Sequence, residues 1–290
     1  MFPVAGRRRR AGDGFDVHDL RIDPVSGLPS EAVMPGGRAI CNDCRMPNLA
    51  NLDRVAHKNL RVQEEVAFGA CKEITMCAVV LNEIPRLVIE YPLAFTKHGE
   101  TGQYICVALF GVDPDRNLYW QAERWNSVTV PLNVGRQPFF VGMADNPAAG
   151  EGAKGLVTCI DLENPGVQTS AGEPLFDADG GETPYLRHKL ALLAELIAGE
   201  QKSRAFADRL AALDLLQSVQ LELKSPDHPP RKISGLYSID EKKLHSLDTV
   251  TLAELHGAGY LHAMYAMLSS LGHLQILARR GAVAPTSAST

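Results

Sequence analysis

The 290-residue sequence contains no run of apolar residues long enough to cross a bilayer. A membrane-spanning helix needs about 18 to 25 such residues, so no transmembrane segment is predicted. The first residues, MFPVAGRRRRAGDG, include the arginines 7–10, but no apolar stretch follows them as it would in a secretory signal. We therefore expect a soluble, cytoplasmic protein, and we interpret the arginine run as part of a solvated tail.

Cysteine and clustered basic charge are also scarce. Six cysteines are too few for a disulfide scaffold and fit the reducing cytoplasm. The net charge is -5 and the pI is about 6.0, with no concentration of Lys and Arg in the part expected to fold. Nucleic acid is therefore not expected as a partner.

Common catalytic signatures are absent as well. The histidines form no H-E-x-x-H pair, and no G-x-S-x-G nucleophile motif occurs. The segment GEGAKG at 150–155 lacks the G-K-[ST] ending of a phosphate-binding loop. The sequence therefore assigns no cofactor and no catalytic residue.

What is present predicts an α+β fold. Residues 1–47 are rich in Pro and Gly without apolar periodicity, which predicts an irregular N-terminal extension. A folded domain is expected over 48–280, followed by a disordered tail over 281–290. Within the domain, a β-rich N-terminal half of short mixed or antiparallel strands is expected to pack against a helical C-terminal half.

Local patterns predict several elements of the first half. Apolar residues recur at helical spacing in 48–62 and predict a helix there. The segments YPLAFTKH and QYICVALFGV, joined by GETG, predict a β-hairpin. One or two helical turns are expected in NEIPRLVIEY, and further strands are expected in MCAVV, NLYW, VTVPL, FFVGM and GLVTCIDLE.

Start and stop signals place the later elements. Thr183 followed by Pro184 predicts a capped helix start. We expect Gly199 to end that helix and Ser203 to cap the next one. The alternation in 219–223 and the following RKISGLYSID predict two strands that return on each other. A capping box of Thr251 and Glu254 predicts the start of a last helix that runs to residue 280.

Four cysteines and one histidine are candidate zinc ligands. Cys41 and Cys44 form a C-x-x-C pair, Cys71 and Cys77 lie further on, and His57 can substitute for one ligand. The spacing of the second pair is loose, and the apolar surroundings of Cys77 favour a buried cysteine instead. The sequence alone leaves metal binding by these five residues open.

His57 has a second interpretation. Asp53 precedes it by one turn of the expected helix, so the Asp53 carboxylate can orient the ring as a general base. The alternative is an ordinary hydrogen-bonded histidine. The acidic segment LFDADGGETP contains Asp177, Asp179 and Glu182. It lacks the ligand spacing of a calcium loop, and it predicts a turn before a helix.

The segment 111–140 concentrates the aromatic residues of the chain. It holds both tryptophans and five of the 18 Phe, Trp and Tyr residues, in a polar stretch interrupted by Pro and Gly. Aromatic faces combined with an amide and a guanidinium are typical of binding hot spots. Core packing of a small sheet, with Arg136 reaching the surface, explains the same residues and is the preferred interpretation. The candidate binding residues are Asn117, Trp120, Trp125, Arg136 and Phe139.

An ordered series of segments resembles the SapC family of bacterial proteins over about residues 48–280. The series consists of YPLAF, ALFGVDPDRNLYW, VPLNVGRQPFFVG, CIDLE, GEPLFDADGGETPYL and GLYSIDEKKLHSLDTVTLAELHGAGYLHAMYAMLSSLGHLQIL. The sequence departs from the family pattern in GRQPF, where many members carry two adjacent basic or aromatic residues before PF. The N-terminal segment that carries Cys41 and Cys44 also lies outside the family pattern.

The resemblance implies a protein of poorly defined activity, from a family that takes its name from a surface-layer-associated protein. Members often occur near flavin-dependent halogenases and TonB-dependent outer-membrane receptors. An ABC-transporter permease shares the family's label, but it needs several membrane helices, which this sequence lacks.

The sequence and the resemblance therefore leave two candidate functions. The first is a non-catalytic accessory protein that binds a protein or peptide through the 111–140 segment, in surface-layer or outer-membrane-receptor physiology. The alternative is a metal-dependent or peptide-modifying enzyme that uses His57 with acidic residues such as Asp161 or Asp179. The sequence predicts no oligomeric state.

Overall fold

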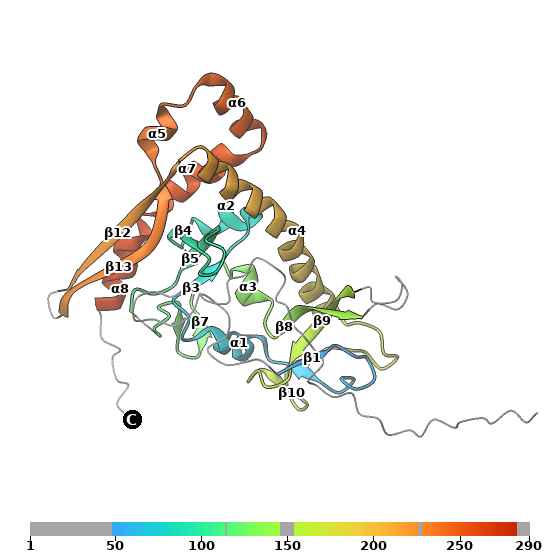
Figure 1. Cartoon of the computed structure of the whole chain (residues 1–290). Coiled ribbons are helices and arrows are strands. Elements are labelled where there is room, and N and C mark those ends of the chain that lie inside the picture. Colours follow the sequence, from blue (N-terminus) through green and yellow to red (C-terminus); the bar gives the residue numbers. More distant parts are fainter. Residues whose placement is uncertain (1–47, 114, 146–153, 226–227, 283–290) are drawn as a thin grey trace, which may run out of the picture.

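The computed structural model describes residues 48–113, 115–145, 154–225 and 228–282 (Figure 1). Its strands are β1 (Leu49–Asn51), β2 (Arg61–Val62), β3 (Met76–Ala78), β4 (Leu93–Lys97), β5 (Tyr104–Leu109), β6 (Trp120–Gln121), β7 (Arg124–Trp125), β8 (Phe139–Asp145), β9 (Lys154–Asp161), β10 (Val167–Gln168), β11 (Glu173–Pro174), β12 (Leu216–Ser225) and β13 (His228–Ile239). Every pairing between them is antiparallel.

Helices are short in the first half and longer in the second. They are α1 (Glu64–Ala67), η2 (Phe68–Cys71), η3 (Leu81–Glu83), α2 (Ile84–Leu87), α3 (Leu132–Gly135), α4 (Pro184–Ala212), α5 (Glu241–His245), α6 (Thr249–Gly257), α7 (Tyr260–Ser270) and α8 (His273–Ala282). The strand-rich first half and helical second half confirm the predicted α+β class. No described helix combines the length and the apolar character needed to span a membrane.

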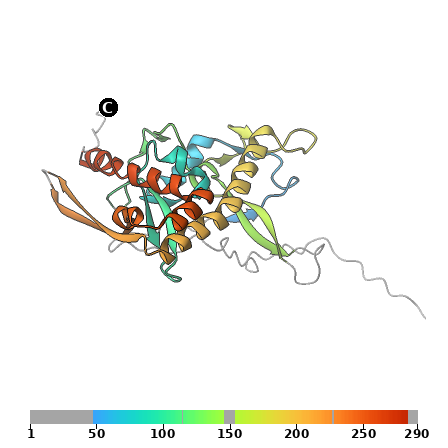
Figure 2. The same ribbon diagram turned by 90° about the horizontal axis from the view of Figure 1, so that it is seen from above.

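The largest sheet has the strand order β12-β13-β4-β5-β3. Its centre is the predicted hairpin β4–β5, in which Leu93 lies opposite Ala108. The hairpin β12–β13 is also confirmed, but β13 pairs with β4 only through Leu236 and Tyr237. The rest of this hairpin therefore extends away from the body, as Figure 2 shows in orange.

Two hydrophobic clusters form the core, and α4 enters both. The larger cluster lies between the five-stranded sheet, α2 and α7, and it includes Phe206 and Leu210 from the C-terminal part of α4. The smaller one lies beside the sheet β1-β9-β8, and it includes Leu186 and Leu193 from the N-terminal part. Figure 1 shows α4 running from α6 and α7 to β8 and β9.

The predicted helix in 48–62 is wrong. Its residues form β1, a series of turns and β2 instead. Pairing of β1 with β9 and a bond from Leu52 N to Thr158 O take the place of helical hydrogen bonds. Leu49 is buried whereas Val55 is 78% exposed, so the apolar spacing does not mark one buried face.

The predicted break in α4 is also wrong. This helix begins at Thr183 as expected, since the Thr183 side chain accepts a hydrogen bond from Leu186 N. It does not end at Gly199. The Ser203 hydroxyl donates to Gly199 O at 2.7 Å and accepts from Leu81 N at 2.7 Å. Both residues thus belong to the contact between α4 and η3.

The single last helix expected from residue 251 is three helices. Asp248, not Thr251, caps α6, because its Oδ1 accepts from Val250 N and Thr251 N. Gly259 separates α6 from α7. Its φ of 75° is a left-handed conformation that glycine adopts without strain. Glu254, the expected capping partner, forms an ion pair with Arg209 on α4.

Two strands expected in 111–140 differ from the prediction. NLYW contributes only its last residue, Trp120, to a tight hairpin, β6–β7, whose two turn residues, Ala122 and Glu123, both have positive φ. VTVPL forms no strand. It is a loop that leads into α3, held by side chains of the segment around α2. MCAVV, FFVGM, GLVTCIDLE and the helical turns in NEIPRLVIEY are found as predicted.

Residues 1–47 and 283–290 lie outside the described residues. The expected N-terminal extension therefore stays a prediction. Of the expected tail 281–290, residues 281 and 282 belong to α8, and disorder of the remainder stays a prediction.

Candidate functional site

The predicted binding residues do not share one exposed face. Asn117, Trp125, Arg136 and Phe139 are buried, whereas Trp120 is partly exposed. Trp125 belongs to the larger core cluster and Phe139 to the smaller one. Of the two interpretations of the aromatic segment, core packing therefore describes these four side chains.

Each buried polar group in this set has a structural partner. Asn117 Nδ2 donates to Cys71 O at 2.9 Å, and its Oδ1 accepts from Tyr119 N at 2.9 Å. Trp125 Nε1 donates to the Tyr91 hydroxyl at 2.9 Å. Aromatic neighbours surround the Trp125 ring, with Phe110 edge-on at 5.0 Å and Tyr119 stacked at 6.4 Å.

Arg136 is a link inside the protein. Its Nε donates to Asn133 Oδ1 at 2.9 Å, and its Nη1 donates to Phe139 O at 2.8 Å. The guanidinium lies 4.1 Å from the centre of the Phe140 ring. Burial of a charge requires such partners, so Arg136 joins α3 to β8 rather than facing a ligand.

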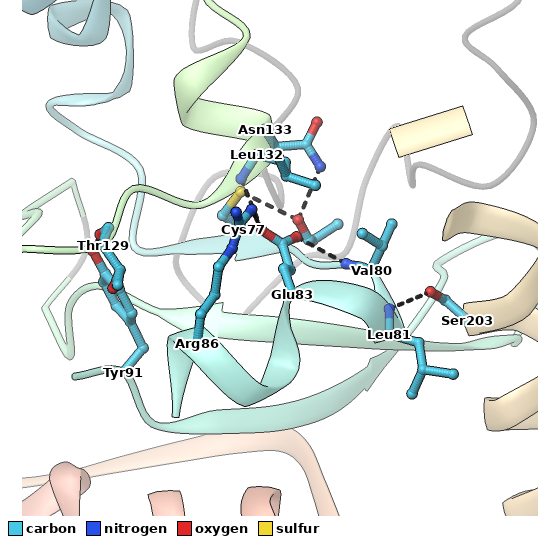
Figure 3. A network of polar contacts seen from close by, with 11 residues as sticks. Cys77, Val80, Leu81, Glu83, Arg86, Tyr91, Thr129, Leu132, Asn133 and Ser203 are labelled. Carbon is cyan, nitrogen blue, oxygen red and sulfur yellow. Dashed lines mark hydrogen bonds and ion pairs between the residues drawn. The ribbon is translucent and has the colours of Figure 1, made fainter. Parts of the chain in front are cut away.

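A buried carboxylate fixes the chain just before Arg136 (Figure 3). Glu83 is fully buried, and its two oxygens accept from Val80 N at 2.9 Å and from Leu132 N at 2.8 Å. Burial raises the pKa of Glu83, against the lowering effect of these bonds and of nearby Arg86. Glu83 therefore ties the start of α3 to the turn that precedes α2.

A second carboxylate holds the loop between β7 and α3. Glu90 Oε2 accepts from Ser127 Oγ at 2.6 Å, Thr129 N at 2.8 Å and Thr129 Oγ1 at 2.8 Å, and its Oε1 accepts from Val128 N at 3.1 Å. We call this arrangement the Glu90 clamp. Burial alone would raise the pKa of Glu90, but the hydrogen bonds outweigh it and hold the pKa below its usual value.

The clamp is continuous with the buried aromatics. Tyr91 donates its hydroxyl to Thr129 O at 2.6 Å while accepting from Trp125. Tyr119 donates its hydroxyl to Glu90 O at 2.6 Å. The buried aromatic residues thus pack against the inner side of the loop and hold Glu90 and Thr129 in position.

What the clamp exposes is apolar. Val128, at the centre of the clamped loop, is 93% exposed, and Ile89, next to Glu90, is 67% exposed. An exposed valine in a flexible loop is unremarkable, but here the backbone on both sides is fixed by hydrogen bonds. The arrangement can present two apolar side chains to a partner with little loss of conformational entropy on binding.

Sequence reasoning missed Glu90, Val128 and Ile89. The clamp joins Glu90 to Val128, which are 38 residues apart, and no local sequence pattern predicts such a contact. Ser127 and Thr129 flank Val128 with hydroxyls suited to a carboxylate, which was the one usable signal.

The candidate enzyme residues His57, Asp161 and Asp179 do not form one site. The ring of His57 is nearly buried, and its Nδ1 accepts from the backbone N of Asp53 at 3.0 Å. Of the two interpretations of His57, the ordinary hydrogen-bonded histidine therefore describes it, while Asp53 Oδ1 accepts from Val55 N and Ala56 N at 2.7 Å each. Burial lowers the pKa of His57, against the opposing charge of Asp53.

The acidic candidates also serve the backbone. Asp161 Oδ1 accepts from Asn48 N at 3.0 Å and Glu163 N at 3.1 Å. Asp177 organises the predicted turn before α4 by accepting from Asp179 N at 3.0 Å and Gly181 N at 2.7 Å. Asp179 itself is exposed.

The structure describes only some of the candidate metal ligands. Cys41 and Cys44 lie outside the described residues, while Cys71 and Cys77 are buried. Among residues 48–282, with the gaps given above, no three His, Cys, Asp or Glu side chains form a group that could hold a metal. A metal-dependent enzyme stays a prediction, and native mass spectrometry would support it by a stoichiometric mass excess lost on denaturation.

Helix α4 carries a buried charge. Lys189 on α4 is fully buried, and its Nζ donates to Glu64 Oε1 and to Gly135 O, the latter at 2.6 Å. Burial lowers the pKa of Lys189, while the Glu64 carboxylate opposes that effect. The ammonium thereby ties α4 to α1 and to the end of α3.

The geometry defines an α+β protein whose aromatic segment supports a fixed, outward-facing loop. A sequence model of the SapC family matches residues 52–277. The chain belongs to the SapC family, as its ordered motifs suggested. Neither the curated proteins nor the solved structures gave a match.

Proposed function

We propose that the protein is a non-catalytic accessory protein that binds a protein or peptide partner through the exposed rim of the 111–140 segment. The observation that carries this proposal is the fixed display of Val128 by the Glu90 clamp. Surface-layer or outer-membrane-receptor physiology is the setting that family membership suggests, with a cytoplasmic location. In this proposal Val128 and Ile89 replace the buried residues Trp125 and Arg136 as contact residues.

Physical chemistry supports such a role for the loop. Covering an exposed Val or Ile side chain contributes about 1 to 2 kcal/mol, and two neighbours supply the apolar centre of a small interface. The clamp restrains the loop before binding, so little of that gain is offset by ordering the backbone. Trp120, the one predicted binding residue that is partly exposed, lies on the neighbouring hairpin β6–β7 and can extend the contact.

Peptide display on the immobilised, full-length protein tests the proposal. A random peptide library is selected on the wild type, and the enriched peptides are synthesised and measured by titration calorimetry. We expect Val128→Asp to weaken their binding at least about tenfold, because a carboxylate then replaces the apolar contact.

Val250→Asp is the matched control. Val250 is 71% exposed in the first turn of α6, where an acidic residue suits the helix. Its substitution should leave peptide binding unchanged. Equal binding to the wild type and to Val128→Asp would refute the proposal.

A further inference from the structure

Helix α8 is attached to the same segment that forms the Glu90 clamp. The His273 ring forms a hydrogen bond through Nε2 with Val88 O at 2.9 Å. Two turns further on, the Arg280 guanidinium lies 5.3 Å from the centre of the Tyr119 ring. Tyr119 in turn donates to Glu90 O. His273 and Arg280, one near each end of α8, therefore both contact residues beside the Glu90 clamp.

Ile276 lies between these two attachments. It is three residues after His273 and four before Arg280, so the three side chains lie on one side of α8. Ile276 is 48% exposed. It therefore adds a third apolar side chain beside the segment that carries Ile89 and displays Val128.

The same surface has unbalanced basic charge. Arg279 and Arg280 are exposed, and neither forms an ion pair with any residue that the structure describes. Glu90, the adjacent carboxylate, has both oxygens occupied by the clamped loop. In a protein of net charge -5, these two guanidinium groups form a local basic edge next to apolar side chains.

We propose that this surface binds a linear segment of a partner protein in which apolar side chains lie next to carboxylates. The surface consists of Ile89, Val128, Ile276, Arg279 and Arg280. The proposal rests on the proposed function and adds the chemistry of the partner: the apolar side chains cover Ile89, Val128 and Ile276, while the carboxylates pair with the arginines. Planar guanidinium groups suit carboxylates because they offer paired donors.

An acidic peptide fits better than a lipid surface. Attraction to anionic lipid contributes about 1 kcal/mol for each basic residue near the membrane, so two arginines give weak attachment. Three separate apolar side chains are also fewer than an interfacial helix inserts. A peptide can meet both the apolar and the basic parts at once.

The peptides selected on the wild type provide the first test. We expect enrichment of sequences that combine Leu, Ile, Val or Phe with Asp or Glu. Their affinity should fall as salt rises from low to physiological concentration, because exposed ion pairs are screened. Enrichment of neutral or basic peptides, or affinity that does not depend on salt, would overturn the proposed partner chemistry.

Charge variants provide the second test. The double variant Arg279→Glu, Arg280→Glu should lose at least about tenfold in affinity, since it replaces attraction by repulsion. The double variant to Lys keeps the charge and should lose much less. Thermal melts of both proteins check that the fold is intact.

The outcomes separate the two proposals. Loss of binding in Val128→Asp with no effect of the charge variants or of salt would leave the proposed function standing and overturn this inference. Binding that ignores Val128→Asp, or no enriched peptide at all, would overturn both. Co-sedimentation of the wild type, but not of the Glu double variant, with phosphatidylserine vesicles and without peptide binding would assign the surface to membranes instead.

Discussion

Val80 lies directly against Gly199 in the middle of α4. A Cβ built on Gly199 would lie 2.7 Å from Val80 Cβ and 2.9 Å from its Cγ2. The glycine therefore allows helix α4 and the turn before α2 to approach closely, which explains why this residue lies inside a helix instead of ending it.

Gly199→Ala should destabilise the protein by about 1 to 3 kcal/mol, although alanine is the better helix former by about 1 kcal/mol. The added methyl group has to displace a buried side chain. Denaturation in urea measures the effect. Gly257→Ala is the control, because nothing lies within 4 Å of its added Cβ, and it should be neutral or slightly stabilising.

Trp125→Ala should lower the free energy of unfolding by about 3 to 5 kcal/mol, as expected for a large buried aromatic residue. It also leaves the Tyr91 hydroxyl without a donor. Thermal and urea unfolding measure the loss. An unchanged melt together with lost peptide binding would instead show that Trp125 contacts the partner.

Arg136→Ala should also destabilise, by about 2 to 4 kcal/mol, because Asn133 Oδ1 and Phe139 O each lose a buried donor. Arg136→Lys keeps the charge but cannot reproduce both bonds, so it should recover only part of the loss. Full recovery in the lysine variant would contradict the need for a planar group.

Glu90→Gln should lower the free energy of unfolding by about 1 to 2 kcal/mol at neutral pH, since an amide accepts through only one oxygen. The folded-state pKa of Glu90 lies below its usual value, so its contribution is present above the unfolded pKa and is lost as pH falls through the folded pKa. The difference between variant and wild type should therefore shrink below about pH 4. Urea denaturation across that range tests the sign.

Lys189→Met should lower the free energy of unfolding by about 1 to 3 kcal/mol at neutral pH, because methionine fills a similar volume but leaves Gly135 O without its donor and Glu64 without its partner. Burial lowers the folded-state pKa of Lys189, so the wild type becomes relatively more stable as pH rises from that value toward the unfolded pKa. The stability lost through the methionine substitution should therefore grow in alkaline solution. Lys189→Ala, which leaves a cavity as well, should destabilise at every pH.

Local chemistry explains which elements were predictable. The hairpin β4–β5 and the cap at Thr183 depend on neighbouring residues, and both were found. Gly199, Ser203 and Thr251 carry equally clear local signals, but other contacts decide their roles. Gly199 packs against Val80, Ser203 bonds to Leu81, and Asp248 caps the helix in place of Thr251. Distant packing overrides local preference at these positions.

The candidate surface shows the same limit. The concentration of aromatics in 111–140 left core packing and a binding face as alternatives. It could not show that the aromatics face inward, because that depends on Phe110, Tyr91 and Glu90 from earlier segments. The exposed residues Val128 and Ile89 carry no signal of their own in the sequence.

The path of α4 has a consequence for how the protein unfolds. One helix supplies Leu186 and Leu193 to one hydrophobic cluster and Phe206 and Leu210 to the other. Losing either cluster would leave half of this helix without tertiary support, and isolated helical segments of that length are marginal in water. The two clusters should therefore melt together in a single cooperative transition, with amide hydrogens along the whole helix exchanging at similarly slow rates.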